Sequence, residues 1–164
     1  MLIRPATHED LENILNIYNR ARIFMRENGN PDQWGDCYPQ KELIIADLEK
    51  GRLRLLVDDE STIAGVFSLF ADGDPDYDEI NGAWLNEDPY VAVHRVASAG
   101  THKGVFTHIF NYCLSLFPNI NNIKIDTHPD NLIMQSILSK HGFIPCGTIN
   151  IENMDFIVFQ FVRS

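Results

Sequence analysis

The segment of this chain with the clearest chemical character covers residues 91–111 and reads V-A-V-H-R-V-A-S-A-G-T-H-K-G-V-F-T-H-I-F-N. An apolar strand pattern ends in small residues, Gly100 and Gly104 follow, and a helical pattern begins. Backbone N–H groups at the start of a helix lack partners, and the helix dipole adds partial positive charge there. The segment therefore predicts a phosphate-binding turn and favours a cofactor-binding enzyme.

The titratable and thiol side chains narrow the chemistry further. The chain has six histidines, and imidazole exchanges its proton near neutral pH, which suits a general acid or base. No two histidines have H-x-H or H-x-x-x-H spacing, so we expect no metal site. The three cysteines form no C-x-x-C motif and are odd in number, so we expect a reducing compartment.

The charge balance limits the class of partner. Lys and Arg number 13 and Asp and Glu number 23, for a formal net charge of −10, which argues against nucleic acid as a partner. Residues 71–79 form an acidic loop, A-D-G-D-P-D-Y-D-E. This loop has two interpretations: an ordinary solvated loop, or a surface that attracts a cationic amine.

The length and composition predict one globular domain over residues 1–164. No apolar run approaches the roughly 20 residues that span a bilayer, so we expect no membrane partner. The first ten residues lack the apolar segment of a signal peptide, and we therefore expect a cytoplasmic protein.

The periodicity predicts the elements that position these residues. A capping box of Thr7 and Asp10 opens the first helix, and the breaker cluster at Asn28–Pro31 ends it. The predicted helices cover residues 11–28, 39–50, 105–117 and 129–141. The predicted strands cover residues 2–4, 53–57, 62–70, 90–97, 123–127, 143–151 and 154–162, with a weak strand at 80–85. The order predicts an α/β (α+β) fold with a mixed sheet of six to seven strands and helices on both faces.

This order and two motifs resemble the GNAT superfamily of acetyl-CoA-dependent N-acetyltransferases over nearly the whole chain. The family's pyrophosphate loop, Arg or Gln, two residues, Gly, one residue, then Gly or Ala, corresponds here to Thr101, Gly104 and Phe106. The later N-x-x-A…Y-x-x-x-G-F pattern corresponds to residues 131–143, which begin at Asn131 and end in Gly142-Phe143. The resemblance implies a sheet that is splayed at its centre and acetyl-CoA as cosubstrate, with no metal.

The resemblance also implies how the cosubstrate is held. Asn131 corresponds to a position whose side chain commonly touches the cofactor arm, and Lys103 would add positive charge near the phosphates. Phe106 replaces a residue that is usually tiny, so its ring must turn into the core for its backbone N–H to serve the phosphates. The implied cofactor-binding residues are Val96, Thr101, His102, Lys103, Gly104, Val105, Phe106, Thr107 and Asn131.

The reaction that the resemblance implies is direct attack of an amine on the acetyl thioester. A backbone N–H near His94 would polarise the carbonyl. Some members carry a glutamate base where this chain has Tyr90, and a phenol of pKa about 10 is a poor base that could order a water. Strand alternation predicts Tyr90, Ala92, His94 and Val96 on one face, which makes His94 the best base. Glu79, Asp88 or solvent are the alternatives.

The remaining predicted site residues complete the catalytic and acceptor sites. Leu138 stands where many members carry a tyrosine that protonates the departing thiolate, so we predict His128, at the end of the neighbouring strand, as the acid. Trp34 and Tyr38 lie between the first two helices and are either core residues or walls of the amine pocket. Glu79 is predicted to attract the amine.

Three functions fit these motifs. The first is acetylation of a small-molecule amine. The second is a non-catalytic acyl-CoA or ligand-binding module, which Phe106 and Leu138 favour. The third is acetylation of a protein or peptide. The final hairpin carries Phe156, Val158, Phe159 and Phe161, and a hairpin with this much apolar surface at an exposed edge predicts a homodimer.

Overall fold

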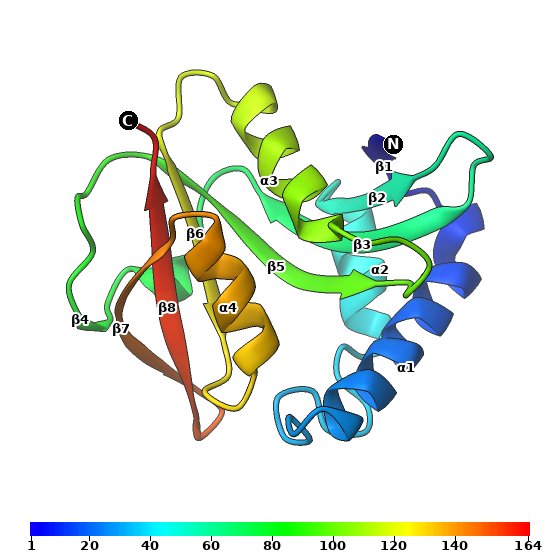
Figure 1. Cartoon of the computed structure of the whole chain (residues 1–164), viewed down its shortest axis with the longest axis horizontal. Helices are drawn as coiled ribbons and strands as arrows, with labels where there is room; N and C mark the ends of the chain where they lie inside the picture. Colours follow the sequence, from blue (N-terminus) through cyan, green and yellow to red (C-terminus); the bar gives the residue numbers. More distant parts are fainter.

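The computed structural model describes residues 1–164 and contains one eight-stranded sheet flanked by helices (Figure 1). The sheet order is β1-β2-β3-β5-β6-β8-β7-β4. The strands are β1 (Leu2–Pro5), β2 (Leu53–Val57), β3 (Ile63–Phe70), β4 (Asn81–Gly82), β5 (Tyr90–Ser98), β6 (Asn122–Thr127), β7 (Ile144–Ile151) and β8 (Met154–Val162). The helices are α1 (Leu11–Glu27), α2 (Lys41–Glu49), α3 (Val105–Leu116) and α4 (Leu132–Lys140), with short 3₁₀ turns at His8–Asp10 and Pro75–Tyr77.

The predicted order of elements is confirmed, with differences at the ends of elements and in the number of strands. The weak strand predicted at 80–85 is reduced to β4, which pairs with β7 and adds an eighth strand. Helix α4 begins at Leu132 rather than Pro129 because Asn131 caps it: its Oδ1 accepts the N–H of Met134 at 3.0 Å. No helix is both long and apolar enough to cross a membrane.

The sheet is antiparallel except at its centre, where β5 and β6 run parallel. These two strands pair only where Tyr90–Ala92 faces Asn122–Lys124, although β5 continues to Ser98 and β6 to Thr127. Beyond this short ladder the strands diverge, and Figure 1 shows the sheet opening there like a V. The predicted central splay is therefore present. It leaves the β6-facing edge of the second half of β5 without a strand partner.

The helices cover the sheet unequally. α3 and α4 share one face, where Ile109 and Leu138 join a continuous core with the central strands. On the opposite face, α1 and α2 cover the β1–β3 half through Tyr18 and Ile44. The loop that contains Tyr77 covers the remaining half of that face. This is the acidic loop of residues 71–79, and Asp74 within it is hydrogen-bonded to Tyr90 at the start of β5.

A β-bulge interrupts the middle of β5. Ala97 pairs with Val66 and His94 with Ser68, so two residues of β5 oppose one residue of β3. Arg95 has a φ of 51°, in the left-handed region that non-glycine residues rarely adopt. The extra residue shifts the alternation of side chains. The prediction that Val96 shares a face with His94 is therefore wrong, because Val96 packs against the core on the α3–α4 face.

Buried polar contacts hold this bulge. The Arg95 guanidinium donates to both carboxylate oxygens of Asp47 on α2, at 2.8 and 2.9 Å. Asp47 is 2% exposed and also accepts the hydroxyl of Ser68. The Tyr18 hydroxyl donates to the Arg95 carbonyl at 2.8 Å. The left-handed residue is thus fixed from α1, α2 and β3 together.

The final hairpin lies inside the sheet and not at its edge. β8 runs between β6 and β7, and Val158 and Phe159 are buried in the chain's own core. The apolar residues on which the prediction of a dimer depended are therefore largely used within one chain. The homodimer stays a prediction that no longer has this support.

Candidate active site

Two adjoining cavities occupy the region where β5 and β6 separate. One has a volume of about 510 Å³ and the other of about 600 Å³. Both are lined by Met25 from α1, Val96 from β5, and Asn131 and Met134 at the start of α4. The opening of the sheet therefore connects a larger cavity near α3 with a smaller one near the acidic loop.

The larger cavity contains the glycine turn and the start of α3. Gly104 precedes α3 with a φ of 72°, and no atom lies within 4 Å of the place where its side chain would begin. The Phe106 ring packs against His141 and Phe143 in the core, at centroid distances of 5.1 and 6.0 Å. Because the ring is turned away, the first N–H groups of α3 face open space. The turn thus fits a pyrophosphate, and the apolar wall from Phe24 and Ile133 fits the remainder of an acyl-CoA.

The structure brings most of the predicted cofactor-binding residues to this cavity. Thr101 and Lys103 do not line it and are exposed. The Thr101 hydroxyl instead pairs with Nδ1 of His102 at 2.8 Å. The predicted residues that line the cavity are Val96, His102, Gly104, Val105, Phe106, Thr107 and Asn131.

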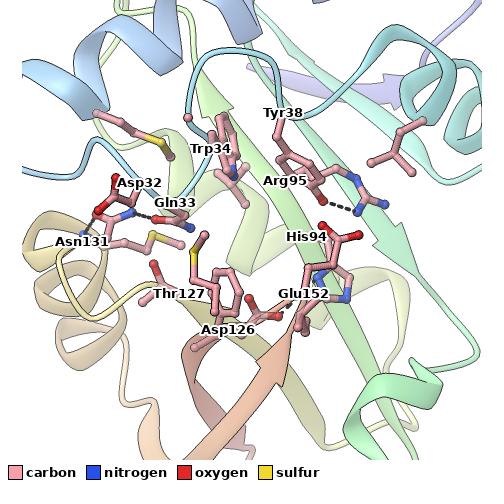
Figure 2. Close-up of a pocket in the computed structure, with 18 of the residues that line it drawn as sticks. Asp32, Gln33, Trp34, Tyr38, His94, Arg95, Asp126, Thr127, Asn131 and Glu152 are labelled. Carbon is pink, nitrogen blue, oxygen red and sulfur yellow. Dashed lines mark hydrogen bonds and ion pairs between the residues drawn. The ribbon is translucent and has the colours of Figure 1, made fainter.

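Asn131 stands between the two cavities with its amide already engaged. Its Oδ1 caps α4, and its Nδ2 donates to Oε1 of Gln33 at 3.0 Å. Gln33 belongs to the loop between α1 and α2, so this bond joins that loop to α4 across the opening of the sheet (Figure 2). One Nδ2 hydrogen remains for a ligand. The first role of Asn131 is therefore to fix the partition between the cavities.

The smaller cavity is acidic and is lined by residues from several separate parts of the chain. The α1–α2 loop contributes Trp34 and Tyr38, which both line this cavity, and their role as walls of an amine pocket stays a prediction. Both also pack on the α1 core, so the two interpretations left open are compatible. Figure 2 shows the cavity with side chains converging from this loop, from β5 and β6, and from the β7–β8 turn. Its acidic residues are Asp32, Asp36, Asp74, Asp76, Asp126 and Glu152.

His94 lies between two carboxylates at the floor of this cavity. Its Nε2 is 2.8 Å from Oδ2 of Asp74, and its Nδ1 is 3.7 Å from Oδ2 of Asp126. The Nε2 contact has ion-pair distance without hydrogen-bond alignment. The ring also packs edge-on against Phe70 with centroids 4.6 Å apart, and it lies 5.5 Å from the ring of Tyr77. The imidazole is thus fixed in position, with 13% of its side chain exposed.

The two carboxylates differ in their affinity for protons. Burial raises the pKa of Asp126, against the opposing effects of His94 and of the Tyr77 hydroxyl, which donates to it at 2.6 Å. Burial also acts to raise the pKa of Asp74, but contacts with His94 and the N–H of Asp76 outweigh it and lower that pKa. Burial raises the pKa of Tyr77 well above its usual value. Asp74 therefore binds a proton less readily than Asp126, and Tyr77 stays a hydroxyl donor.

This arrangement suits the removal of a proton from a substrate. A neutral imidazole that takes a proton becomes a cation directly between two acidic side chains, which stabilise the charged form. The fixed ring needs little reorganisation when the charge appears. The geometry therefore supports the sequence-based choice of His94 as a general base and adds the two carboxylates that assist it.

Three other predicted residues lie outside both cavities. The Tyr90 hydroxyl donates to the carbonyl of Asp74 and accepts its N–H, both at 2.9 Å, so Tyr90 holds the loop that carries Asp74. Nδ1 of His128 accepts the N–H of Asp130 at 3.1 Å in the turn before α4. Glu79 is exposed, and so is the alternative base Asp88. None of the four lines the cavities, because each faces a turn or solvent and not the splay.

The sequence does not single out the carboxylates that enclose His94. Asp74 lies within the acidic loop, from which the prediction takes Glu79 instead. Asp126 is a lone carboxylate at the end of the apolar strand I-K-I-D-T, and this was the one signal that could have singled it out. Glu152 gave no signal beyond its place in a hairpin turn.

Comparisons with known proteins agree with this geometry. No family model and no curated protein matches the sequence. A solved GNAT-family acetyltransferase from Streptococcus agalactiae 2603 has 26% identity and a TM-score of 0.86, covering 99% of this chain and 95% of that one. A candidate phosphinothricin N-acetyltransferase has 20% identity and a TM-score of 0.64, covering 99% and 98%. A ribosomal-protein-alanine N-acetyltransferase from Brucella melitensis has 19% identity and a TM-score of 0.61, covering 99% of each chain.

The last two neighbours share the fold and carry the names of different acceptors, so the fold alone does not select an acceptor. The features of this chain that agree with such a fold are the β5–β6 splay, the glycine turn before α3 and the order of the elements. Taken together, they place this chain in the GNAT superfamily of acetyltransferases.

Proposed function

We propose that this protein transfers the acetyl group of acetyl-CoA to an amine of a small molecule by direct attack. The observation that carries the proposal is the meeting of two unlike cavities at the splay, one with a glycine turn and one with a buried histidine. Acetyl-CoA would supply the activated acetyl thioester at the junction beside Val96 and Asn131. The smaller cavity would hold the amine.

In this proposal, residues at different positions bind the cofactor, accept the proton and polarise the carbonyl group. Gly104 and the first turn of α3 hold the pyrophosphate through backbone N–H groups. His94 would take the proton of the amine, and Asp74 and Asp126 would stabilise the imidazolium that results. As the C–N bond forms, the C–S bond of the thioester breaks, and coenzyme A leaves as a thiolate that takes a proton from solvent. Backbone N–H groups on the open edge of β5 donate to the thioester oxygen, and one such donor contributes a few kcal/mol to the transition state.

A thiol-release assay tests the proposal. The protein is mixed with acetyl-CoA and a broad panel of small amines, and free coenzyme A is measured with a thiol reagent. We expect turnover with some amines and none with acetyl-CoA alone. Acetyl-CoA that raises the melting temperature without thiol release on any amine would contradict the enzyme and support the non-catalytic binding module.

Mass spectrometry separates the small-molecule function from protein acetylation. A cell extract is incubated with labelled acetyl-CoA, and the label is followed in the protein fraction and in the small-molecule fraction. We expect enzyme-dependent label in the small molecules. Label found only on proteins would favour the peptide acceptor.

A further inference from the structure

Resting on the proposed function, we propose that the natural acceptor is a small amine that carries a second positive charge in addition to the amine that reacts. The proposal deepens the assignment of the smaller cavity, because it concerns which acceptors that cavity selects. It rests on the cavity's uncompensated charge and on a buried hydroxyl that has no partner.

The charge of the smaller cavity is strongly negative. Six of its lining residues are Asp or Glu, and its only Lys or Arg is Arg95. The charge of Arg95 is already matched by the bidentate contact with Asp47. Of the acidic residues at the rim, Asp36 pairs with Arg26, whereas Asp32, Asp76 and Glu152 have no ion-pair partner. An acceptor must therefore enter a field that favours cations.

The reacting amine cannot satisfy this field by itself. It must lose a proton to attack the thioester, so at that moment it is neutral. Carboxylates around a monoamine stabilise its ammonium form, which raises its pKa and opposes the loss of that proton. A second cationic group remains charged throughout the reaction. Such a group would be held by the rim carboxylates while the first amine reacts beside His94.

Thr127 provides an independent observation that points to a ligand in the same cavity. It is 1% exposed, it lines the cavity at the end of β6, and its Oγ1 has no hydrogen-bond partner. Figure 2 shows it on the cavity wall near Asp126. A buried hydroxyl without a partner is costly to folding, so the chain retains it here against a stability cost. An amine N–H is a partner that it would accept.

Glu152 is the rim carboxylate best placed to select the acceptor. It occupies the turn between β7 and β8 with a φ of 50°, and Asn153 follows with a φ of 65°. This two-residue turn fixes the backbone between two paired strands. Figure 2 shows Glu152 on the side of the cavity that holds His94, and Asp32 on the side that holds Asn131. The two rim carboxylates therefore bracket the cavity.

A series of acceptors with similar chain length tests the charge requirement. Putrescine carries two ammonium groups, n-butylamine carries one, and γ-aminobutyrate replaces the second with a carboxylate. We expect kcat/KM to fall in that order, with putrescine about tenfold above n-butylamine at low ionic strength. The advantage should shrink as salt is added, because screening weakens the rim charges.

Variants connect this preference to the cavity. Glu152→Gln and Asp32→Asn should each lower kcat/KM for putrescine several-fold and leave n-butylamine nearly unchanged. Glu60→Gln is the matched control, because Glu60 is an exposed carboxylate in the β2–β3 turn and lines neither cavity. An equal loss in all three variants would overturn the selective role of the rim.

A substitution at Thr127 is expected to lower the activity without lowering the stability. Thr127→Val removes the hydroxyl and keeps the shape, so we expect kcat/KM for amines to fall about tenfold while the melting temperature stays the same or rises by about 2–4 °C. The KM for acetyl-CoA should not change. Thr127→Ser should retain most of the activity. A Val variant that is less stable and fully active would overturn the role of this hydroxyl.

The outcomes separate this inference from the proposed function. If n-butylamine or γ-aminobutyrate equals putrescine as an acceptor, the enzyme is an acetyltransferase and the inference is wrong. If no amine is acetylated, the proposed function fails, and calorimetric titration of putrescine decides the inference. The inference is supported if putrescine binds more tightly than n-butylamine and if its binding weakens in Glu152→Gln. The inference is overturned if the two amines bind equally or if Glu152→Gln changes nothing.

Discussion

The central feature at the scale of single residues is a histidine placed between two unequal carboxylates. Asp74 has a lowered pKa and Asp126 a raised one, although both contact the same imidazole ring. The difference arises because backbone and cationic contacts offset the burial of Asp74, whereas burial dominates at Asp126. In the proposed reaction, His94 would receive a proton in a position that neighbouring side chains already fix.

Replacement of this residue gives the first prediction. His94→Gln should lower kcat by about 100-fold or more, because it removes the proton acceptor without removing the cavity. The KM for acetyl-CoA should change little, since His94 lies outside the larger cavity. Steady-state kinetics by thiol release would measure both values.

His128→Gln is the matched comparison. The sequence suggests a loss of similar size, whereas the structure places His128 in the turn before α4 and outside both cavities. We expect kcat within about threefold of the unchanged protein, in line with surface substitutions remote from a site. A loss as large as that of His94→Gln would restore His128 as the acid.

At the scale of elements, the bulge of β5 decides which side chains reach the site. One extra residue at Arg95 shifts the alternation of side chains along β5 by one position. His94 and Val96 therefore face opposite sides of the sheet. The left-handed conformation of Arg95 is kept by a buried ion pair that links β5 to α2. The site therefore depends on Asp47, a residue that lines neither cavity.

Breaking this pair gives the second prediction. Asp47→Asn should reduce the free energy of unfolding by about 3 kcal/mol, because the Arg95 charge is left buried without its partner. The double variant Asp47→Asn with Arg95→Met should recover part of that loss, since no charge remains to be buried. Urea denaturation followed by circular dichroism would measure both. A double variant less stable than Asp47→Asn alone would contradict the assignment.

The start of α1 gives the third prediction. The Asp10 carboxylate accepts the Thr7 N–H at 2.8 Å and both guanidinium N–H groups of Arg4 at 2.8 Å. The Arg4 contact, followed by the Thr7 N–H, lowers the pKa of Asp10 to about 2 against the effect of burial. Because the folded pKa is below the unfolded value of 3.8, the stabilisation is present above that pH and is lost as the pH falls toward 2.

Asp10→Asn should therefore lower the free energy of unfolding at neutral pH by about 1 kcal/mol or less, because it removes the charge that pairs with Arg4. The difference from the unchanged protein should narrow as the pH falls below about 4. Melting curves recorded across this range would measure it. Glu60→Gln, at an exposed turn, should give no such difference, and a pH-independent gap for Asp10→Asn would contradict the ionic explanation.

At the scale of the whole molecule, the proposed function depends on two adjoining cavities. The partition is the contact of Gln33 with Asn131, which joins the α1–α2 loop to α4. Cofactor and acceptor would approach from different sides and be present together. The thiols do not offer an obvious covalent carrier: Cys113 is buried and its pKa is raised to about 12, and Cys37 is exposed at the acidic cavity.

This arrangement gives the fourth prediction, a sequential mechanism with both substrates bound before transfer. Initial-rate plots against one substrate at several concentrations of the other should intersect. Cys37→Ser should retain kcat within about twofold, because no acetyl group passes through the thiol. Parallel plots together with an inactive Cys37→Ser would instead indicate an acetyl-enzyme.

Much of the fold could be predicted from the sequence because its signals are local. The capping box at Thr7 and Asp10, the glycine turn at Gly104 and the alternation of strands all depend on residues close together in the chain. These patterns also identified the strand that carries His94. The site was predicted less well, since Asp74, Asp126 and Thr127 come from separate elements, and Tyr90 and His128 were assigned roles that their positions do not support.

The sequence by itself determined the order of the elements, the glycine turn before α3 and the strand that bears the histidine, because periodicity and turn chemistry are properties of neighbouring residues. The tertiary structure alone decided where β5 and β6 separate, which face Val96 takes after the bulge, and which carboxylates enclose His94. These depend on pairing register and on packing between distant segments, and a single inserted residue changes the face of every side chain beyond it.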